Sequence, residues 1–171
     1  MWKRVVPFAY SPDIFSIPDS FWASSGAKVV LSDLDNTLDP YSVKLPSPRV
    51  KELKDRLESL GIKLRIASNN HSKRVQDYAS ALGVEADCFL LKPFSQKLKK
   101  VLRELGVEKT EAILVGDQIS TDVIAGNGAG IRTILTEPLS PEEPTCTKIN
   151  RLFDRPIRKK LRKKGLLKPI Q

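Results

Sequence analysis

Residues 29–38 read VVLSDLDNTL and join a short apolar run to a cluster of polar residues. The apolar run, residues 29–31, is typical of a strand that is buried on both faces in a parallel sheet. In an extended chain, positions two apart face the same side, so Asp33 and Asp35 can point into one pocket. Two carboxylates at a buried strand end repel each other unless a cation lies nearby. The segment therefore predicts a core strand that ends at an acidic, metal-binding site.

The same pattern repeats along the chain, with short apolar runs alternating with amphipathic stretches of helical spacing. Helix-start and helix-stop residues such as Ser47-Pro48, Gly61, Gly83 and Gly106 separate them. This alternation predicts an α/β fold, a Rossmann-like three-layer sandwich with a mostly parallel five-stranded sheet. The expected strands are residues 29–31, 64–67, 88–91, 112–115 and 131–135.

Polar side chains follow several of these strands. Ser68 follows the second strand, Lys92 the third and Asp117 the fourth, and Asp122 begins the next helix. In open α/β sheets, active sites lie at the carboxyl ends of the strands. We therefore expect Asp117 to complete a Mg²⁺ site with Asp33, since Mg²⁺ prefers oxygen ligands, and Asp122 to act as a supporting acid.

Together these groups predict phosphoryl transfer. Asp33 is the expected nucleophile, and Asp35 would protonate the leaving oxygen and then activate water. A metal ion and an ammonium group would neutralise the phosphate charge. The residues expected to hold the phosphate are Thr37, Ser68, Asn69 and Lys92.

Four motifs, DLDNTL, ASNN, LKP and GDQISTDVIAGN, occur in this order between about Ala27 and Leu135. They resemble the four motifs of haloacid dehalogenase phosphatases, most closely the class IIIA, YqeG-type branch. The resemblance implies an aspartyl-phosphate on Asp33, acid and base catalysis by Asp35, and magnesium held by Asp33, Asp117 and the backbone carbonyl of Asp35. Because the branch includes phosphatases of phosphatidylglycerophosphate, a phospholipid headgroup is an implied substrate.

The intervals between motifs leave no room for a cap domain. Asp33 to Ser68 accommodates one helix, and Ser68 to Lys92 accommodates a helix and a strand. A capless core with an open site suits a phosphate on a large substrate, such as a lipid headgroup or a protein side chain. A phosphatase for a soluble phosphometabolite or phosphoprotein is the alternative, and a non-catalytic nucleic-acid or membrane adaptor is a rival of another class.

The charge of the chain is uneven. Residues 151–171 contain nine Lys and Arg against one acid, whereas the whole chain carries a net charge of +9. We expect residues 1–150 to form one domain, with an aromatic segment, 1–27, packed on it, and residues 151–171 to form a basic C-terminal tail. Residues 155–171 could be a solvated end or a peripheral contact with an anionic membrane. Nucleic acid is disfavoured, because nothing resembles a base-reading module.

Other features of the sequence indicate the cellular location and exclude other kinds of metal or redox site. Cys88 and Cys146 lack the spacing of a redox or zinc motif, and no stretch has the length of a membrane span. These two observations favour a cytoplasmic protein. It would be peripheral to the membrane if the basic segment binds the bilayer. A calcium loop starting at Asp33 fails, because Leu38 and Lys44 stand where Gly and Glu are needed. The single histidine, His71, receives no role, and the sequence does not fix an oligomeric state.

Overall fold

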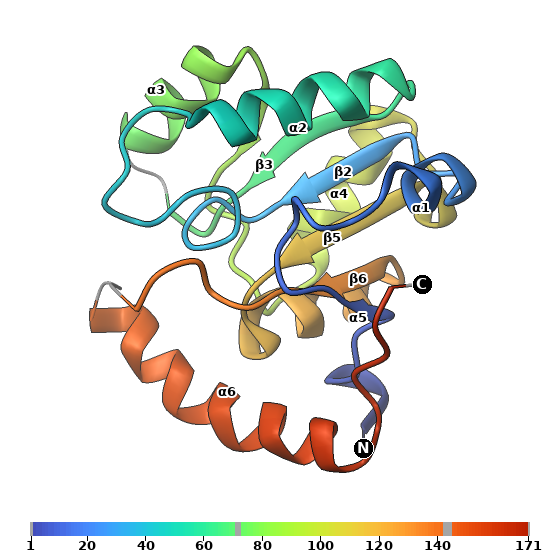
Figure 1. The fold of residues 1–171 in the computed structure, drawn as a ribbon, viewed down its shortest axis with the longest axis vertical. Coiled ribbons are helices and arrows are strands. Elements are labelled where there is room, and N and C mark those ends of the chain that lie inside the picture. Colours follow the sequence, from blue (N-terminus) through green and yellow to red (C-terminus); the bar gives the residue numbers. More distant parts are fainter. Residues whose placement is uncertain (1, 71–72, 142–144, 171) are drawn as a thin grey trace.

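The computed structural model describes residues 2–70, 73–141 and 145–170, and Figure 1 shows a sheet with helices on both of its faces. Every strand pair is parallel, and the strands follow the order β1-β6-β5-β2-β3-β4. The predicted α/β class with a parallel sheet is confirmed. The strands are β1 (Ala9–Tyr10), β2 (Val29–Ser32), β3 (Lys63–Ala67), β4 (Glu85–Asp87), β5 (Ala112–Gly116) and β6 (Arg132–Leu135).

The described part of the sheet has six strands, so the predicted count of five was wrong. The additional strand is β1, which pairs with β6 through Ala9 and Tyr10. A two-residue strand in a proline-rich segment has no periodic pattern to reveal it. It forms because the edge of β6 offers unpaired backbone groups to a neighbouring segment.

Two layers of helices cover the sheet. One core cluster joins Val30 and Ile113 to side chains of α1, α2 and α3, and the other joins Leu31 and Leu114 to side chains of α4 and α5. Alternate residues of the central strands thus supply opposite faces of the core. The α-helices are α1 (Asp19–Ser24), α2 (Pro48–Ser59), α3 (Lys73–Leu82), α4 (Gln96–Leu105), α5 (Ile124–Ala129) and α6 (Thr145–Lys163).

The third strand lies earlier than predicted. Residues 88–91 form a loop in which Phe89 and Leu91 have left-handed backbone angles and are largely exposed, and β4 is the preceding segment Glu85–Asp87. Its acidic residues concealed the strand. Asp87 accepts a 2.9 Å hydrogen bond from Nε of Arg65 on β3, so a cross-strand ion pair helps to stabilise this edge of the sheet.

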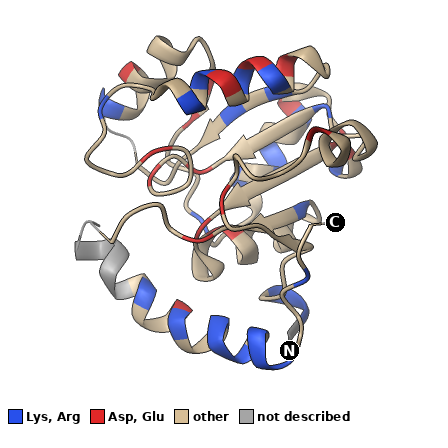
Figure 2. Cartoon of the chain, viewed as in Figure 1, with Lys and Arg blue, Asp and Glu red and all other residues tan. Residues whose placement is uncertain are grey.

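The basic segment 151–171 is not separated from the domain at residue 150. Helix α6 runs through this position along one side of the molecule, and Figure 2 shows its Lys and Arg residues. From residue 150 onward, where burial is described, its buried residues recur at helical spacing and are Arg151, Asp154, Arg158 and Leu161. Beyond the helix the chain returns to β1, where Tyr10 N donates to Lys168 O at 2.7 Å. Within residues 151–170, contacts with the domain thus occur both along α6 and after its end.

None of the helices in the described ranges is long and apolar enough to cross a membrane.

Candidate active site

The first predicted carboxylate lies at the carboxyl end of the central strand. β2 is fully buried between β3 and β5, and Asp33 continues its ladder by donating its backbone N–H to Val115 O at 2.9 Å. The chain then turns at Asn36, whose φ of 63° is a left-handed conformation that Asn tolerates well. This turn brings Thr37 back to the site, where its Oγ1 donates a long 3.4 Å bond to Oδ1 of Asp117.

Two further acids come from the end of the neighbouring strand β5. Asp117 directly follows Gly116 and is completely buried, and Asp122 lies in the π-helical turn Ile119–Val123. Oδ2 of Asp122 accepts the N–H of Gln118 at 3.1 Å. Gly116 is needed for this approach, because a Cβ there would lie 2.3 Å from Cγ of Asp122.

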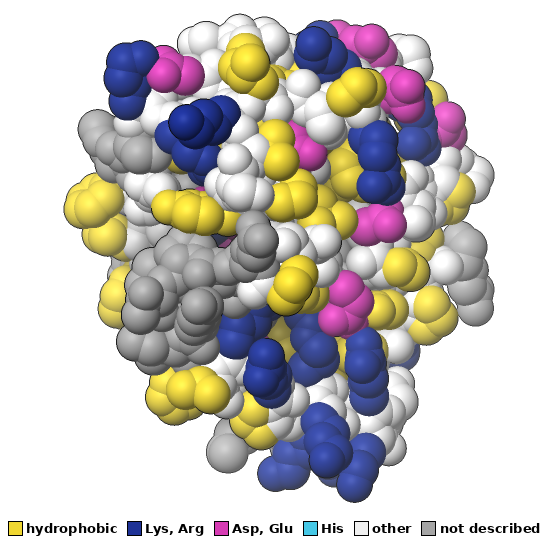
Figure 3. All heavy atoms as spheres, turned by 60° about the vertical axis from the view of Figure 1, so that its left-hand side comes forward, with side chains coloured by type: hydrophobic (Ala, Val, Ile, Leu, Met, Phe, Trp, Pro, Cys, Tyr) yellow, Lys and Arg dark blue, Asp and Glu magenta, His cyan; other side chains and the backbone are white. Residues whose placement is uncertain are grey.

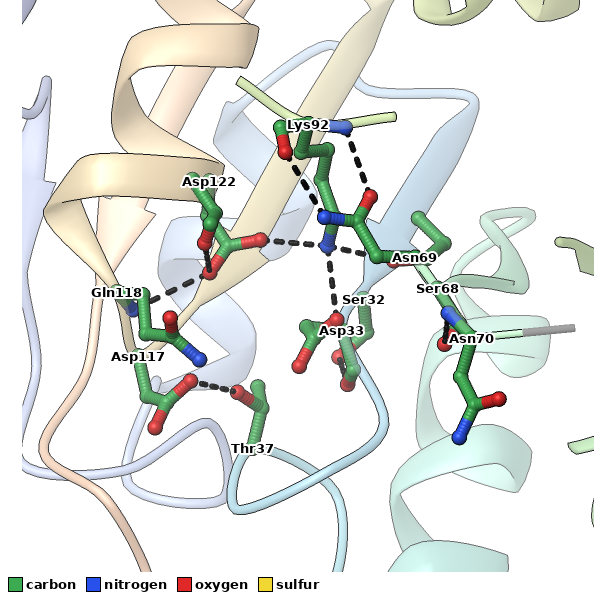
Figure 4. A network of polar contacts seen from close by, with 12 residues as sticks. Ser32, Asp33, Thr37, Ser68, Asn69, Asn70, Lys92, Asp117, Gln118 and Asp122 are labelled. Atoms are coloured by element: carbon green, nitrogen blue, oxygen red, sulfur yellow. Dashed lines mark hydrogen bonds and ion pairs between the residues drawn. The ribbon is translucent and has the colours of Figure 1, made fainter. Parts of the chain in front are cut away.

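Lys92 connects the two strand ends. Its Nζ donates to Oδ1 of Asp33 at 2.7 Å, to Oδ1 of Asp122 at 2.6 Å and to the carbonyl of Ala67 at 2.8 Å (Figure 4). These three acceptors match the three hydrogens of an ammonium group. Burial acts to lower the pKa of Lys92, but the carboxylates of Asp122 and Asp33 outweigh it and raise this pKa, so the lysine stays charged.

The loop after β3 supplies the predicted hydroxyl and amide. Ser68 is buried, and its Oγ accepts the N–H of Asn70 at 3.0 Å. Asn69 bonds the backbone of Lys92 twice, donating from Nδ2 to the carbonyl at 2.9 Å and accepting the N–H at 2.7 Å. Asn69 thus ties the Ser68 loop to the lysine, and His71 lies outside the described residues.

Asp35 stands apart from the other acids. Its Oδ1 accepts a 2.7 Å bond from Nη2 of Arg74 on α3, and this guanidinium lies 5.0 Å from the ring centre of Tyr41. Among the described residues, the acids whose oxygens approach one another within 4.8 Å are Asp33, Asp117 and Asp122. The structure therefore brings three of the four predicted acids together and leaves the carboxylate of the fourth, Asp35, outside this group.

A cavity of about 460 Å³ opens beside these groups. It contains predicted residues from three strand ends and residues that no sequence motif indicated, including Asn150 of α6. Asn150 donates to Oε1 of Gln118 at 3.3 Å, so α6 contributes to the wall. The lining residues are Asp33, Asp35, Tyr41, Ser68, Asn69, Asn70, Lys92, Gln118, Thr121 and Asn150.

The electrostatics of the site favour a cation. Burial raises the pKa of Asp33 to about 8, Lys92 opposes this shift, and the carboxylates of Asp122 and Asp117 add to it. Buried carboxylates that repel one another need positive charge, and the two buried cations that pair with them, Lys92 and Arg151, do not balance three acids. The donors are all hard oxygens, the ligands that Mg²⁺ prefers. The residues present thus fit a divalent metal ion.

The fold and these groups define an enzyme of the α/β class with a carboxylate-based site. Residues 32–136 match the family model described as haloacid dehalogenase-like hydrolase. The probable phosphatase YqeG of Bacillus subtilis (strain 168) is 31% identical over 163 residues, which cover 95% of each chain. The chain therefore belongs to the haloacid dehalogenase-like hydrolase family, as its motifs predicted.

Two further comparisons extend this result. Phosphatidylglycerophosphate phosphatase 1, chloroplastic/mitochondrial, of Arabidopsis thaliana is 31% identical over 176 residues; the match covers 97% of this chain and spans 50% of that relative. The solved structure of cobalt-bound deoxy-D-mannose-octulosonate 8-phosphate phosphatase from Haemophilus influenzae has a TM-score of 0.51 at 14% identity, covering 68% of this chain and 81% of that one. The latter is a likeness of fold alone.

Proposed function

We propose that this chain is a Mg²⁺-dependent phosphatase that hydrolyses a phosphate monoester on an anionic phospholipid headgroup. The observation that carries the proposal is the buried group of Asp33, Asp117 and Asp122, bridged by Lys92, beside an open cavity. Asp33, Asp117 and the backbone carbonyl of Asp35 would hold the metal, with Asp122 in support. The bound ion would supply positive charge against the phosphate oxygens.

The chemistry proceeds in two displacements. The carboxylate of Asp33 attacks phosphorus, and the ester oxygen leaves with a proton from Asp35, which gives an aspartyl-phosphate and an alcohol. Asp35 then takes a proton from water, and the resulting hydroxide attacks phosphorus and releases phosphate and the Asp33 carboxylate. Lys92 keeps Asp33 oriented, and Ser68 and Asn69 line the cavity where the phosphate would bind.

The surroundings of the cavity support a substrate at a lipid surface. Phe89, Leu91 and Phe94, in the loop that carries Lys92, are exposed, and so are Leu152 and Phe153, next to the cavity residue Asn150. Figure 3 shows apolar side chains at several places on one face of the molecule and a group of Lys and Arg side chains in the lower part of that face. Apolar side chains beside basic ones are suited to an anionic bilayer.

The outer side of α6 supplies much of this positive charge. Its exposed cations alternate with the buried positions of the helix and are Arg155, Lys159, Lys160, Arg162 and Lys163. A basic residue near an anionic membrane contributes about 1 kcal/mol to binding. The Arabidopsis relative bears the name of a lipid phosphatase, which also supports this substrate class.

The test is Mg²⁺-dependent phosphate release from phosphatidylglycerophosphate in anionic vesicles, compared with sugar phosphates, nucleotides and phosphopeptides. Asp33→Asn should remain folded and lose turnover. A triple charge reversal on the outer side of α6 (Arg155→Glu, Lys159→Glu and Lys163→Glu) should weaken vesicle binding by about 100-fold or more and leave turnover of a soluble ester intact.

Other outcomes distinguish the alternatives. Preferred turnover of soluble esters, unaffected by the charge reversal, would indicate a phosphatase for a phosphometabolite or phosphoprotein. An active Asp33→Asn variant would contradict the proposed nucleophile. Absence of turnover on every ester, with vesicle or nucleic-acid binding retained, would favour the non-catalytic adaptor.

A further inference from the structure

The buried side of α6 contacts the metal-site acid Asp117. The guanidinium of Arg151 forms an ion pair with Oδ2 of Asp117, and its Nη1 donates to the carbonyl of the same residue at 2.9 Å. Arg158, two turns further along α6, donates from Nη2 to that carbonyl at 2.7 Å. Both arginines are buried, so two cations of one helix converge on the end of β5.

A third buried residue of α6 bonds the segment that follows Asp117. The carboxylate of Asp154, which is 1% exposed, accepts the N–H groups of Ile119 and Ser120, each at 2.8 Å. These N–H groups begin the π-helical turn that carries Asp122. Because the first N–H groups of a helical turn have no partner within it, an acid placed there fixes the position of the turn.

The Arg151 contact involves one particular oxygen of Asp117. In Figure 4 the other oxygen, Oδ1, points to Thr37, whereas Oδ2 turns away from Asp33. Arg151 therefore pairs with the carboxylate oxygen that does not bond Thr37. A planar guanidinium that bonds both the side chain and the backbone of one residue restricts rotation of that carboxylate.

We propose that Arg151 is a positioning residue of the metal site, which holds Asp117 with Oδ1 toward Asp33. The proposal rests on the proposed metal-dependent function. It also assigns α6, which lies beyond the residues 32–136 of the family match, a part in the active site. Metal binding by this chain then depends on a helix whose sequence shows basic charge but no catalytic motif.

The test is binding of Mn²⁺ alone to the full chain, followed by calorimetry, with Arg151→Gln and Arg151→Lys compared with the wild type. Arg155→Gln is the matched control, because Arg155 is exposed and lies one turn along the same helix. Arg151→Gln should weaken Mn²⁺ binding at least about tenfold, the effect typical of removing a residue that orients a metal ligand. Arg151→Lys should be intermediate, and Arg155→Gln should match the wild type.

The kinetics separate positioning from folding. Arg151→Gln should need more metal for half-maximal phosphate release yet recover most of its kcat at saturating metal. Unchanged Mn²⁺ affinity in folded Arg151→Gln would overturn the proposal; if that variant does not fold, wild-type affinity in Arg151→Lys would overturn it. A wild type that binds Mn²⁺ but releases no phosphate would contradict the proposed function alone, and the affinity ratios would still decide the role of Arg151.

Discussion

Nζ of Lys92 lies 2.7 Å from Oδ1 of Asp33, and both side chains are almost completely shielded from solvent. The same ammonium group also contacts Asp122, so it balances one acid that follows β2 and one that lies in the turn after β5. Removal of one member of a buried ion pair leaves its partner uncompensated, which is much more costly than loss of a surface pair. We therefore expect Lys92 to contribute to stability, and to turnover if Asp33 is the nucleophile.

Lys92→Met should lower the free energy of unfolding of the metal-free protein by about 3 kcal/mol, because Asp33 and Asp122 lose their shared cation. Phosphate release should fall at least about 100-fold. Urea denaturation and a phosphate-release assay measure the two effects. Lys99→Met is the control, since Lys99 is exposed on α4, and an equal effect of both substitutions would contradict the role of Lys92.

Asp35→Asn should separate proton transfer from metal binding. Asp35 pairs with Arg74 and its carboxylate lies outside the group of three acids, so its expected metal contact is the backbone carbonyl, which the substitution retains. Turnover should fall by about 10² to 10⁴, the usual value of a general acid and base. Mn²⁺ affinity should change little.

The matched comparison for this variant is Asp117→Asn, which should lose Mn²⁺ binding because Asp117 belongs to the group of three acids. Calorimetry with Mn²⁺ measures both variants. Equal loss of affinity in Asp35→Asn and Asp117→Asn would show that the Asp35 carboxylate is a metal ligand, contrary to this assignment.

Gly116→Ala should displace Asp122. The new methyl group would lie 2.3 Å from Cγ and 2.5 Å from Oδ2 of Asp122, too close for either to stay in place. We expect a large loss of turnover and a lower melting temperature. Gly61→Ala is the control: it meets no atom within 4 Å but has a φ of 74°, so it should cost about 1 kcal/mol of stability without reducing turnover. Normal turnover in Gly116→Ala would be incompatible with the close packing.

Metal binding should depend on pH through Asp33. Burial raises the pKa of this carboxyl to about 8, with Lys92 opposing and the other acids adding to the shift. Below this pH the proton on Asp33 must leave before a cation can bind, so the affinity for Mn²⁺ rises with pH by up to about tenfold per pH unit. Above pH 8 the affinity levels off. Mn²⁺ titrations on both sides of pH 8 measure the slope. A flat profile below pH 8 would contradict the raised pKa.

Sequence patterns predicted the core of the site because parallel strands end at the same edge of a sheet. Asp33, Lys92 and Asp117 are far apart in the chain, yet each follows a strand or its loop and they meet at that edge. The predicted position of the third strand was wrong because residues 88–91 are apolar and the true strand, β4, is acidic. Local hydrophobicity cannot reveal a strand that is stabilised by an ion pair with its neighbour.

The contacts of Arg74 and Arg151 could not be predicted from the sequence. An arginine in a basic helix has the same local pattern whether it faces solvent or a buried acid. Its contact depends on which side of the helix packs, and this is decided by residues elsewhere in the fold. The buried positions of α6 recur at helical spacing, but three of them, Arg151, Asp154 and Arg158, are charged, so no apolar stripe marked the inner side.

The two sides of α6 are under different constraints. Arg151 and Arg158 bond Asp117, which follows β5, and Asp154 bonds the turn that carries Asp122. Arg155, Lys159 and Lys163 are exposed on the other side of the same helix. The outer residues can therefore diverge while the inner ones are retained. Proteins with this helix could acquire a different surface charge, and with it a different place of action, by substitutions that leave the catalytic centre untouched. Deletion of the helix, in contrast, would remove the outer charge and the inner supports together.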